Sequence, residues 1–249
     1  MECIMAYSKY LNHSGIDIVV GRVLNTTGIH KFGAVPAMSQ SKTGTIWDIN
    51  DTLYPWSAFT IADTLDIVAT NSGDVADITH DRSVTIFGLD ENYNLIQETV
   101  TITGLTGQST TKLFKRVYRA CFNDGPNANI GIINININGI TICRINAGKG
   151  QTLMCVFTIP AGYTGYLTQG TATVQKGGDA TIDMFVRYTD SNSFRIGHTA
   201  EISGEGGQYD YIFTLPSKIP AMSDIDVRAS VRTNNARVTA AFDLILVKN

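Results

Sequence analysis

Residues 133–139 read Ile-Asn-Ile-Asn-Ile-Asn-Gly, and this stretch decides the fold. Successive side chains of a β-strand point to opposite faces, so all the isoleucines share one face and all the asparagines share the other. That is the pattern of a half-buried strand with an uncharged polar face. Asn138-Gly139 is a strong signal for a type I′ hairpin turn, and we expect the return strand from Ile140 to Ile145.

The same kind of pattern extends from Ile46 to Lys248, as short alternating runs broken by Gly, Asn, Asp or Pro. No stretch of helical period interrupts it. We therefore predict an all-β fold, an antiparallel β-sandwich or jelly roll with an irregular N-terminal arm. The expected strands cover residues 45–49, 64–69, 83–88, 95–103, 112–122, 133–139, 140–145, 152–159, 165–174, 181–188, 194–202, 209–215, 225–231 and 238–247.

The first 44 residues are less regular than the rest. Residues 16–20 and 22–24 are candidates for a strand, whereas residues 25–44 are rich in Thr, Ser, Gly and Lys and contain Pro36. A loop of that length is uncommon in a compact domain unless it binds something. We therefore expect residues 1–44 to be an arm that reaches a neighbouring subunit. Residues 45–249 would form the body, with 123–127 as the best candidate for an internal boundary.

Charged residues make up 16% of the 249-residue chain and hydrophobic residues 43%. This charge content is well below the usual quarter, and a surface poor in charge favours assembly over a free monomer. The formal net charge of −3 and the pI of about 5.8 argue against a nucleic-acid partner. The densest basic cluster is Lys115-Arg116 with Arg119, which we interpret as a solvated strand face.

The four cysteines (Cys3, Cys121, Cys143 and Cys155) are scattered and include no Cys-x-x-Cys pair. The last three lie in apolar strand runs, which favours buried free thiols over disulfides or metal ligands and predicts folding in a reducing cytoplasm. The residues from Met1 to Leu11 lack the pattern of a signal peptide. No run approaches 18 apolar residues, so we expect no membrane span.

A metal site is not expected. Asn134, Asn136 and Asn138 before Gly139 resemble the front of a calcium loop, but Ile145 stands where a bidentate Glu is required. An exposed or subunit-facing strand is the favoured interpretation of these asparagines.

Catalytic patterns are equally weak, because the Gly-x-Ser-x-Gly, His-Glu-x-x-His, P-loop and dinucleotide motifs are absent from the sequence. A glycosidase needs two converging carboxylates, and the acids near one another in sequence are interpreted as structural. We therefore expect no catalytic residue and no cofactor. The residues weighed were the acids Asp48, Asp51, Asp63 and Asp66, the histidines His13, His30, His80 and His198, and the turn glycines Gly104, Gly107, Gly148 and Gly150.

Four aromatic residues leave two interpretations open. Tyr163 and Tyr166, with Trp47 and Trp56, would line a sugar-binding face if they converged, because aromatic rings stack on apolar sugar faces. The favoured alternative is that these large amphipathic rings cap the core at turns.

Several stretches, taken in order, resemble a family of virion structural proteins of tailed bacteriophages that is common in marine and cyanobacterial phages. The resemblance covers the chain from about Ile29 to the C-terminus and rests on the order of the motifs. Those motifs are residues 29–33 (IHKFG), 45–48 (TIWD), 87–90 (FGLD), 97–100 (QETV) with Gly104, 147–154 (AGKGQTLM), 158–163 (TIPAGY), 224–229 (DIDVRA) and 242–247 (FDLILV).

The resemblance implies a β-rich, non-enzymatic virion protein made in bacterial cytoplasm. Our leading hypothesis is a capsid decoration (cement) protein that contacts the major capsid protein and other copies of itself, as a homotrimer. The alternative is a tail-associated or fibre-like protein that binds host glycan. A glycan-cleaving enzyme on the same scaffold is the third hypothesis.

Overall fold

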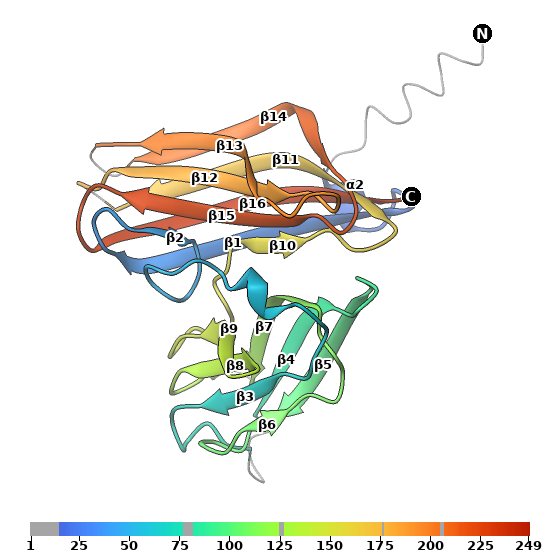
Figure 1. Ribbon diagram of the computed structural model, residues 1–249, viewed down its shortest axis with the longest axis vertical. Helices are drawn as coiled ribbons and strands as arrows, with labels where there is room; N and C mark the ends of the chain where they lie inside the picture. Colours follow the sequence, from blue (N-terminus) through green and yellow to red (C-terminus); the bar gives the residue numbers. More distant parts are fainter. Residues whose placement is uncertain (1–14, 77–81, 125–126, 176, 205–206) are drawn as a thin grey trace.

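The computed structural model describes residues 15–76, 82–124, 127–175, 177–204 and 207–249. Its strand pairings are antiparallel, and the strands form two lobes that lie one above the other in Figure 1. The predicted all-β fold of antiparallel sheets is confirmed. The helical elements among these residues are α2 (Gly15–Val19) and the 3-10 turn η1 (Trp56–Ala58).

The large lobe is a sandwich of two sheets, and its core lies between them. Strand β12 alternates strictly between buried and half-buried residues, the mark of a strand with one face in a core. The first sheet has the order β1 (Thr26–Met38), β16 (Ala236–Lys248), β11 (Tyr163–Val174), β14 (Gln208–Ile219). The second sheet has the order β10 (Val156–Thr158), β15 (Asp224–Val231), β12 (Ala180–Arg187), β13 (Arg195–Ile202), and β2 (Thr43–Thr45) also pairs with β15.

The small lobe has a separate core of its own, built from two smaller sheets. One sheet has the order β6 (Gln108–Ser109), β3 (Asp66–Ala69), β8 (Ile133–Ile137), β9 (Ile140–Ile145). The other has the order β5 (Leu95–Thr101), β4 (Ser83–Leu89), β7 (Arg116–Asn123).

The small lobe is an insertion in the large one. The chain leaves the large lobe after β2 and returns to it at β10 (Figure 1). The structure therefore divides the body at about residues 47–54 and 153–155. The predicted boundary at 123–127 instead falls inside the small lobe, at the end of β7. A turn signal such as Asn-Asp-Gly-Pro marks the end of a strand but does not say which core the next strand joins.

The predicted N-terminal arm is replaced in part by regular structure. Residues 26–38 form β1, which pairs with β16 along its length, and residues 43–45 form β2. The stretch expected as a strand at 16–20 contains α2 instead. Residues 1–14 of the predicted arm lie outside the described residues.

Strand β14 continues past residue 215, where the predicted strand ends, as far as Ile219. Its register with β11 shifts between Leu167, which faces Ser217, and Gln169, which faces Ile212. Residues 213–216 therefore bulge out opposite Thr168, and the strand resumes after them. Pro is tolerated here because β14 is an edge strand and Pro216 lies in its bulge.

The two segments that connect the lobes, at Ile46 and Cys155, pack directly against Gly33 of β1. A Cβ on Gly33 would lie 2.3 Å from the Ile46 carbonyl oxygen and 2.6 Å from the Cys155 nitrogen. These two backbones are hydrogen-bonded to each other where the chain enters and leaves the small lobe. Strand β1 therefore packs against the crossing with no room for a side chain at this position.

Candidate functional site

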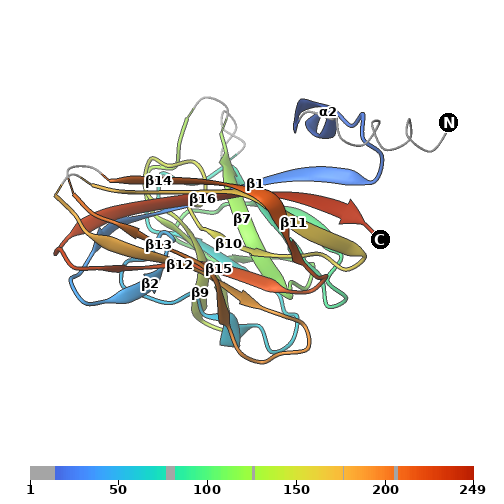
Figure 2. The ribbon, with the colours of Figure 1, turned by 90° about the horizontal axis from the view of Figure 1, so that it is seen from above.

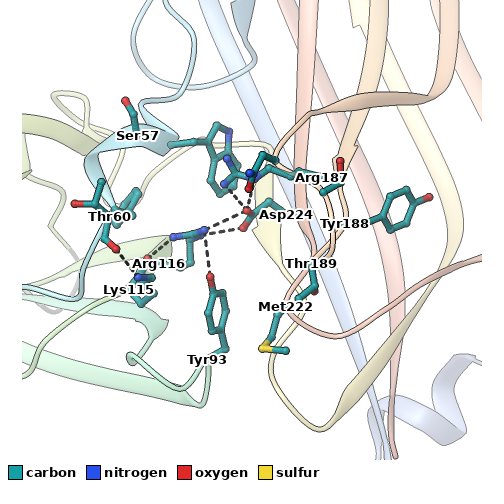
Figure 3. A pocket seen from close by; sticks show the side chains of 14 residues that line it. Ser57, Thr60, Tyr93, Lys115, Arg116, Arg187, Tyr188, Thr189, Met222 and Asp224 are labelled. Carbon is teal, nitrogen blue, oxygen red and sulfur yellow. Dashed lines mark hydrogen bonds and ion pairs between the residues drawn. The ribbon is translucent and has the colours of Figure 1, made fainter.

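The most elaborate polar cluster lies at the junction of the two lobes, beside a pocket of about 370 Å³ (Figure 3). The pocket receives residues from η1, from the 90–94 turn and β7 of the small lobe, and from β12 and β15 of the large lobe. It is therefore formed by segments far apart in the sequence. Its centre is an ion cluster of Arg116, Arg187 and Asp224.

Register explains how this cluster forms. Asp224, the first residue of β15, lies directly opposite Thr158 of β10 and Arg187 of β12. Asp226 points to the same side as Asp224, because side chains two apart in a strand share a face. Arg116, the first residue of β7, reaches this row from the small lobe.

Asp224 is 2% exposed and its two oxygens accept five hydrogen bonds. Arg116 donates from Nε to Oδ1 at 2.9 Å and from Nη2 to Oδ2 at 3.2 Å, the bidentate arrangement that makes Arg–carboxylate pairs strong. Arg187 donates twice to Oδ2, and the Thr158 hydroxyl donates to Oδ1 at 2.6 Å. The carboxylate is thus engaged entirely with the protein itself.

Asp226 forms the second half of the cluster and is fully buried. It accepts hydrogen bonds from the Trp56 indole at 3.0 Å and from the Thr45 hydroxyl at 2.8 Å. Arg228 donates to it from Nε at 2.9 Å. These contacts tie η1 and β2 to the second sheet, so the linker into the small lobe is fixed by the same row of acids.

Aromatic rings surround the arginines. The Arg116 guanidinium lies 5.5–5.6 Å from the ring centroids of Trp56, Phe59 and Tyr93, and Arg187 lies 4.7 Å from that of Phe194. Burial opposes the charge of Arg116, but the hydrogen bonds and charge of Asp224 outweigh it, so the pKa of Arg116 lies above its ordinary value. Ring faces and a carboxylate together make a buried arginine tolerable.

The pocket is also lined by polar residues outside the ion cluster. Tyr93 has a positive φ of 61° in a turn that Asp90 holds by accepting the Asn92 and Asn94 amides, and its hydroxyl lies 3.4 Å from Arg116. Ser191 and Asn192 also line the pocket. Polar groups together with aromatic rings in one pocket suit a small hydroxylated ligand such as a sugar.

A second junction pocket, of about 270 Å³, includes Lys31 of β1. Lys31 is 7% exposed, donates to the Tyr118 carbonyl, and forms no ion pair among the described residues. Burial lowers its pKa from 10.5 to about 8. Arg119 and His30 also line this pocket.

Arg116 overturns one sequence prediction. The cluster Lys115-Arg116-Arg119 was expected to be a solvated strand face, but Arg116 is buried against Asp224 and three aromatic rings. Its partners lie 23 to 60 residues before it and 108 after it, so no local pattern marks them. The sequence feature that could have indicated a buried ion pair is Asp224-x-Asp226, two acids in a strand between apolar neighbours.

The four candidate aromatic residues do not form one face. Trp47 and Trp56 are buried in the small-lobe core, each with its indole N–H hydrogen-bonded. Tyr163 packs against the large-lobe core, and Tyr166 lies on the outer face of the first sheet. The core-capping interpretation is confirmed for the two tryptophans, although Trp56 also lines the junction pocket.

The asparagine row is used for strand pairing. Asn134 accepts a hydrogen bond from Arg144 and Asn136 accepts one from Thr141, both across the β8–β9 hairpin. Asn138 and Gly139 have positive φ angles of 50° and 78°, which confirms the predicted type I′ turn.

The candidate acids lie in separate hydrogen-bonded positions. Asp48 accepts from the Leu153 amide and the Asn146 side chain, and burial raises its pKa to about 7. Asp51 accepts from Ser39, and Asp66 accepts from Ser109. Asp63 accepts from the amide of Thr64, the next residue.

Two histidines and three cysteines can be placed. His30 contacts Asp243 and His198 contacts Tyr209, whereas His13, His80 and Cys3 lie outside the described residues. Cys143 and Cys155 are buried free thiols as predicted, and Cys121 is a half-buried one. Burial raises the pKa of Cys155 to about 12.

Within the described ranges, no group of three or more His, Cys, Asp or Glu residues is arranged to hold a metal ion. The described helices are also too short and polar to cross a membrane.

The sequence matches no protein-family model and no curated protein. Among solved structures, the chain is similar to a chain of the naturally occurring empty particles of cowpea mosaic virus, with a TM-score of 0.23, 8% identity and coverage of 76% of this chain and 83% of that one. It is also similar to a chain of the infectious bursal disease virus VP2 subviral particle, with a TM-score of 0.22, 7% identity and coverage of 90% and 72%. These structural neighbours are viral capsid proteins.

Proposed function

We propose that this chain is a virion structural protein of a tailed bacteriophage that decorates the capsid. It would stabilise the head by adding buried area across joints between capsomers, without chemistry. The ordered motifs that resemble virion structural proteins support this proposal, as does the low charge content. Its partners would be the major capsid protein and other copies of itself, and its location would be the virion.

One structural observation carries the proposal. Among the described residues, the outer face of the first sheet is four strands wide and consists largely of uncharged side chains, with charged residues at Asp210, Lys218 and Asp243. Monomers rarely leave a broad surface of this kind uncovered, because apolar side chains on it gain free energy when a partner removes them from water. This outer face consists mainly of Thr26, Gly28, His30 and Phe32 on β1, Thr239, Ala241, Asp243, Ile245 and Val247 on β16, Thr164, Tyr166, Gln169 and Thr171 on β11, and Asp210, Ile212 and Lys218 on β14.

The junction cluster fits the same function, because its acids and arginines bind one another, and Arg116 and Trp56 link the small lobe to the acids of the large lobe. A passive capsid component needs its two lobes held rigidly.

The experiment is to locate the protein in purified particles by mass spectrometry and imaging. A decoration protein is expected on the head at high copy number. A few copies per particle, or a position on the tail, would overturn the proposal.

The junction pocket favours a second candidate, a tail-associated protein that binds host glycan. The pocket is lined by polar residues such as Tyr93, Ser191 and Asn192 together with the aromatic residues Trp56 and Phe59, a combination that suits a sugar.

Binding assays separate the two candidates. The purified protein should bind expanded empty capsids and should not bind host cells or lipopolysaccharide. Saturable binding to cells that a Ser191→Ala/Asn192→Ala variant loses would favour the glycan-binding candidate instead. A matched Leu105→Ala variant, changed at an exposed small-lobe position, should leave either binding unchanged.

A further inference from the structure

The second junction pocket gathers positive charge. Its volume is about 270 Å³, and most of its lining comes from residues 28–32 of β1 in the large lobe and from Tyr118 and Arg119 of β7 in the small lobe. Among the described residues that line it, three are basic (His30, Lys31 and Arg119) and none is acidic. A pocket lined by charges of one sign attracts ions of the opposite sign.

The buried amine of Lys31 spans the two sides of this pocket. It extends from β1 to β7, which lie close together in Figure 2, and donates a hydrogen bond to the Tyr118 carbonyl. An ammonium has three protons to donate, and this bond uses one of them. Burying the charge without a counter-ion costs free energy, and it lowers the pKa of Lys31 to about 8. An anion in the pocket would supply both the opposite charge and further acceptors.

Arg119 brings a second cation to the same pocket. Its guanidinium forms no ion pair among the described residues and donates to the side-chain oxygen of Gln151 at 2.9 Å. The amide nitrogen of Gln151 is therefore left as a neutral donor beside the two cations. The charge of Arg119 also lowers the pKa of Lys31, so the two cations repel each other across the pocket.

Two acids act near this pocket, but neither neutralises the two cations. Asp243 is paired with His30 and lines a different pocket, the one beside α2. Asp48 is hydrogen-bonded elsewhere, and burial raises its pKa to about 7, so it carries only part of a negative charge at neutral pH. The charges of Lys31 and Arg119 therefore remain uncompensated within the described part of the chain.

Charge and size together indicate the kind of ligand. Two uncompensated cations match an anion with two negative charges, and a phosphate group is doubly charged above a pKa of about 6. Arginine and lysine are both well suited to binding phosphate oxygens. Sites for drug-sized ligands have volumes of roughly 300–1,000 Å³. A pocket of about 270 Å³ is smaller than these and suits a small anion.

We propose that the pocket between β1 and β7 is a phosphate-binding site, in which the Lys31 ammonium and the Arg119 guanidinium hold a phosphate dianion and the Gln151 amide donates to it. The phosphate is either the free ion or the phosphoryl group of a small phosphomonoester, because both present the same charge and oxygens. This site is separate from the proposed role in the virion, and its tests use the purified chain.

The first test is isothermal titration calorimetry of the full chain with inorganic phosphate at neutral pH and low salt. Phosphate should bind with one ion per chain. Lys31→Met and Arg119→Gln should each lower the affinity at least tenfold, because each removes one of the two charges that hold the anion. Lys218→Met and Arg237→Gln, at exposed positions of β14 and β16 outside the pocket, are the matched controls and should bind like the wild type.

Thermal unfolding checks the same binding without relying on heats. A ligand that binds only the folded state raises its stability, so phosphate should raise the melting temperature of the wild type and of both control variants. It should leave that of Lys31→Met unchanged. Arg119 is exposed, so Arg119→Gln is expected to fold and should show a reduced shift.

The pH dependence identifies the amine that binds the anion. Above pH 8 the affinity of the wild type should fall, because Lys31 loses its proton while phosphate stays doubly charged. The residual affinity of Lys31→Met should not fall in this way. This variant is a fair control, because the other groups that interact with Lys31 (Arg119, Asp48, Cys121, Cys143 and Cys155) are present in both proteins.

Two further ligands define the chemistry of the anion. Tighter binding of glycerol 3-phosphate than of inorganic phosphate would assign the pocket to a phosphomonoester, and the reverse order would assign it to the free ion. Acetate, which carries a single charge, should bind at least tenfold more weakly than either.

Four outcomes would overturn the proposal. They are no binding at millimolar phosphate, an affinity that Lys31→Met or Arg119→Gln leaves unchanged, acetate that binds as tightly as phosphate, and an equal loss of affinity in Arg237→Gln. The last would mean that phosphate responds to the net charge of the chain and not to this pocket.

Discussion

Lys31 is a cation in a place that disfavours charge. It is 7% exposed, it has no ion-pair partner among the described residues, and its pKa is lowered by burial to about 8. At a pH below the pKa of the folded state, the lysine is charged in both the folded and the unfolded protein, and burial of the charge lowers the free energy of unfolding. Above the unfolded-state pKa of 10.5 the lysine is neutral in both states and this cost is absent, so the cost declines as the pH rises from about 8 to 10.5.

Replacing Lys31 with Met should therefore stabilise the protein at pH 7. A shift of about 2.5 pKa units corresponds to roughly 3 kcal/mol, from which the lost bond to the Tyr118 carbonyl subtracts about 1 kcal/mol. Urea unfolding at pH 7 and pH 10 measures this. The gain should shrink at pH 10, and a Lys31→Met protein that is less stable than wild type at pH 7 would show that the ammonium has an unrecognised partner.

Residues differ in how far the local sequence predicts their structure. The pair Asn138-Gly139 predicts its own turn conformation, because residues other than Gly, Asn and Asp seldom adopt a positive φ. The local sequence does not predict whether Arg116 is buried, because an arginine in a strand can lie on a solvated face or in a buried ion pair. The partner that decides between them, Asp224, is 108 residues away.

Strands were largely predictable, because alternation and turn residues are local properties. The prediction held for the β8–β9 hairpin and for the β4–β5 hairpin with its Asp90–Asn94 turn. It missed β1, whose run of Thr, Gly, Ala and Pro36 has little alternation. Strand β1 is held by its pairing with β16, more than 190 residues later, and tertiary contacts override weak local propensity.

The close packing of Gly33 of β1 against the backbone of Ile46 and Cys155 gives a second prediction. Gly33→Ala should destabilise the protein by about 2 kcal/mol, because the methyl group meets two backbone atoms that cannot rotate away. Gly170→Ala is the matched control, since nothing lies within 4 Å of a Cβ at that strand position. Thermal or urea unfolding of both variants measures the difference. Equal stability of the two variants would contradict the close approach.

The two lobes have separate cores, and the ion cluster joins them across their junction. Arg116 belongs to the small lobe, whereas Asp224 and Arg187 belong to the large one. Strand β10 lies at the seam, because Phe157 packs in one core and Val156 in the other. The cluster should therefore contribute to the cooperativity of unfolding as well as to its free energy.

A double-mutant cycle on Arg116 and Asp224 tests this. Arg116→Met and Asp224→Asn should each cost roughly 3 kcal/mol, because each leaves a buried charge without part of its partner. The double variant should recover part of the loss. The chain's two tryptophans, Trp47 and Trp56, lie at the junction and report its unfolding by fluorescence.

Hydrogen exchange measures the protection of the backbone amides in each lobe separately. In the wild type, β4 and β12 should be protected to similar extents, and in Arg116→Met the two should diverge. Strictly additive single-variant effects, with unchanged exchange, would mean that the cluster does not couple the lobes.

The sequence by itself determined that this chain is all-β, where most of its strands and turns lie, and that its surface is poor in charge. These are properties of residues near one another in the chain, set by side-chain alternation and by the backbone preferences of Gly, Asn and Pro. Only the tertiary structure decided that the strands divide between two cores and that Arg116 is buried against Asp224. Each of these depends on pairings between segments about a hundred residues apart or more, which sequence alternation leaves undetermined.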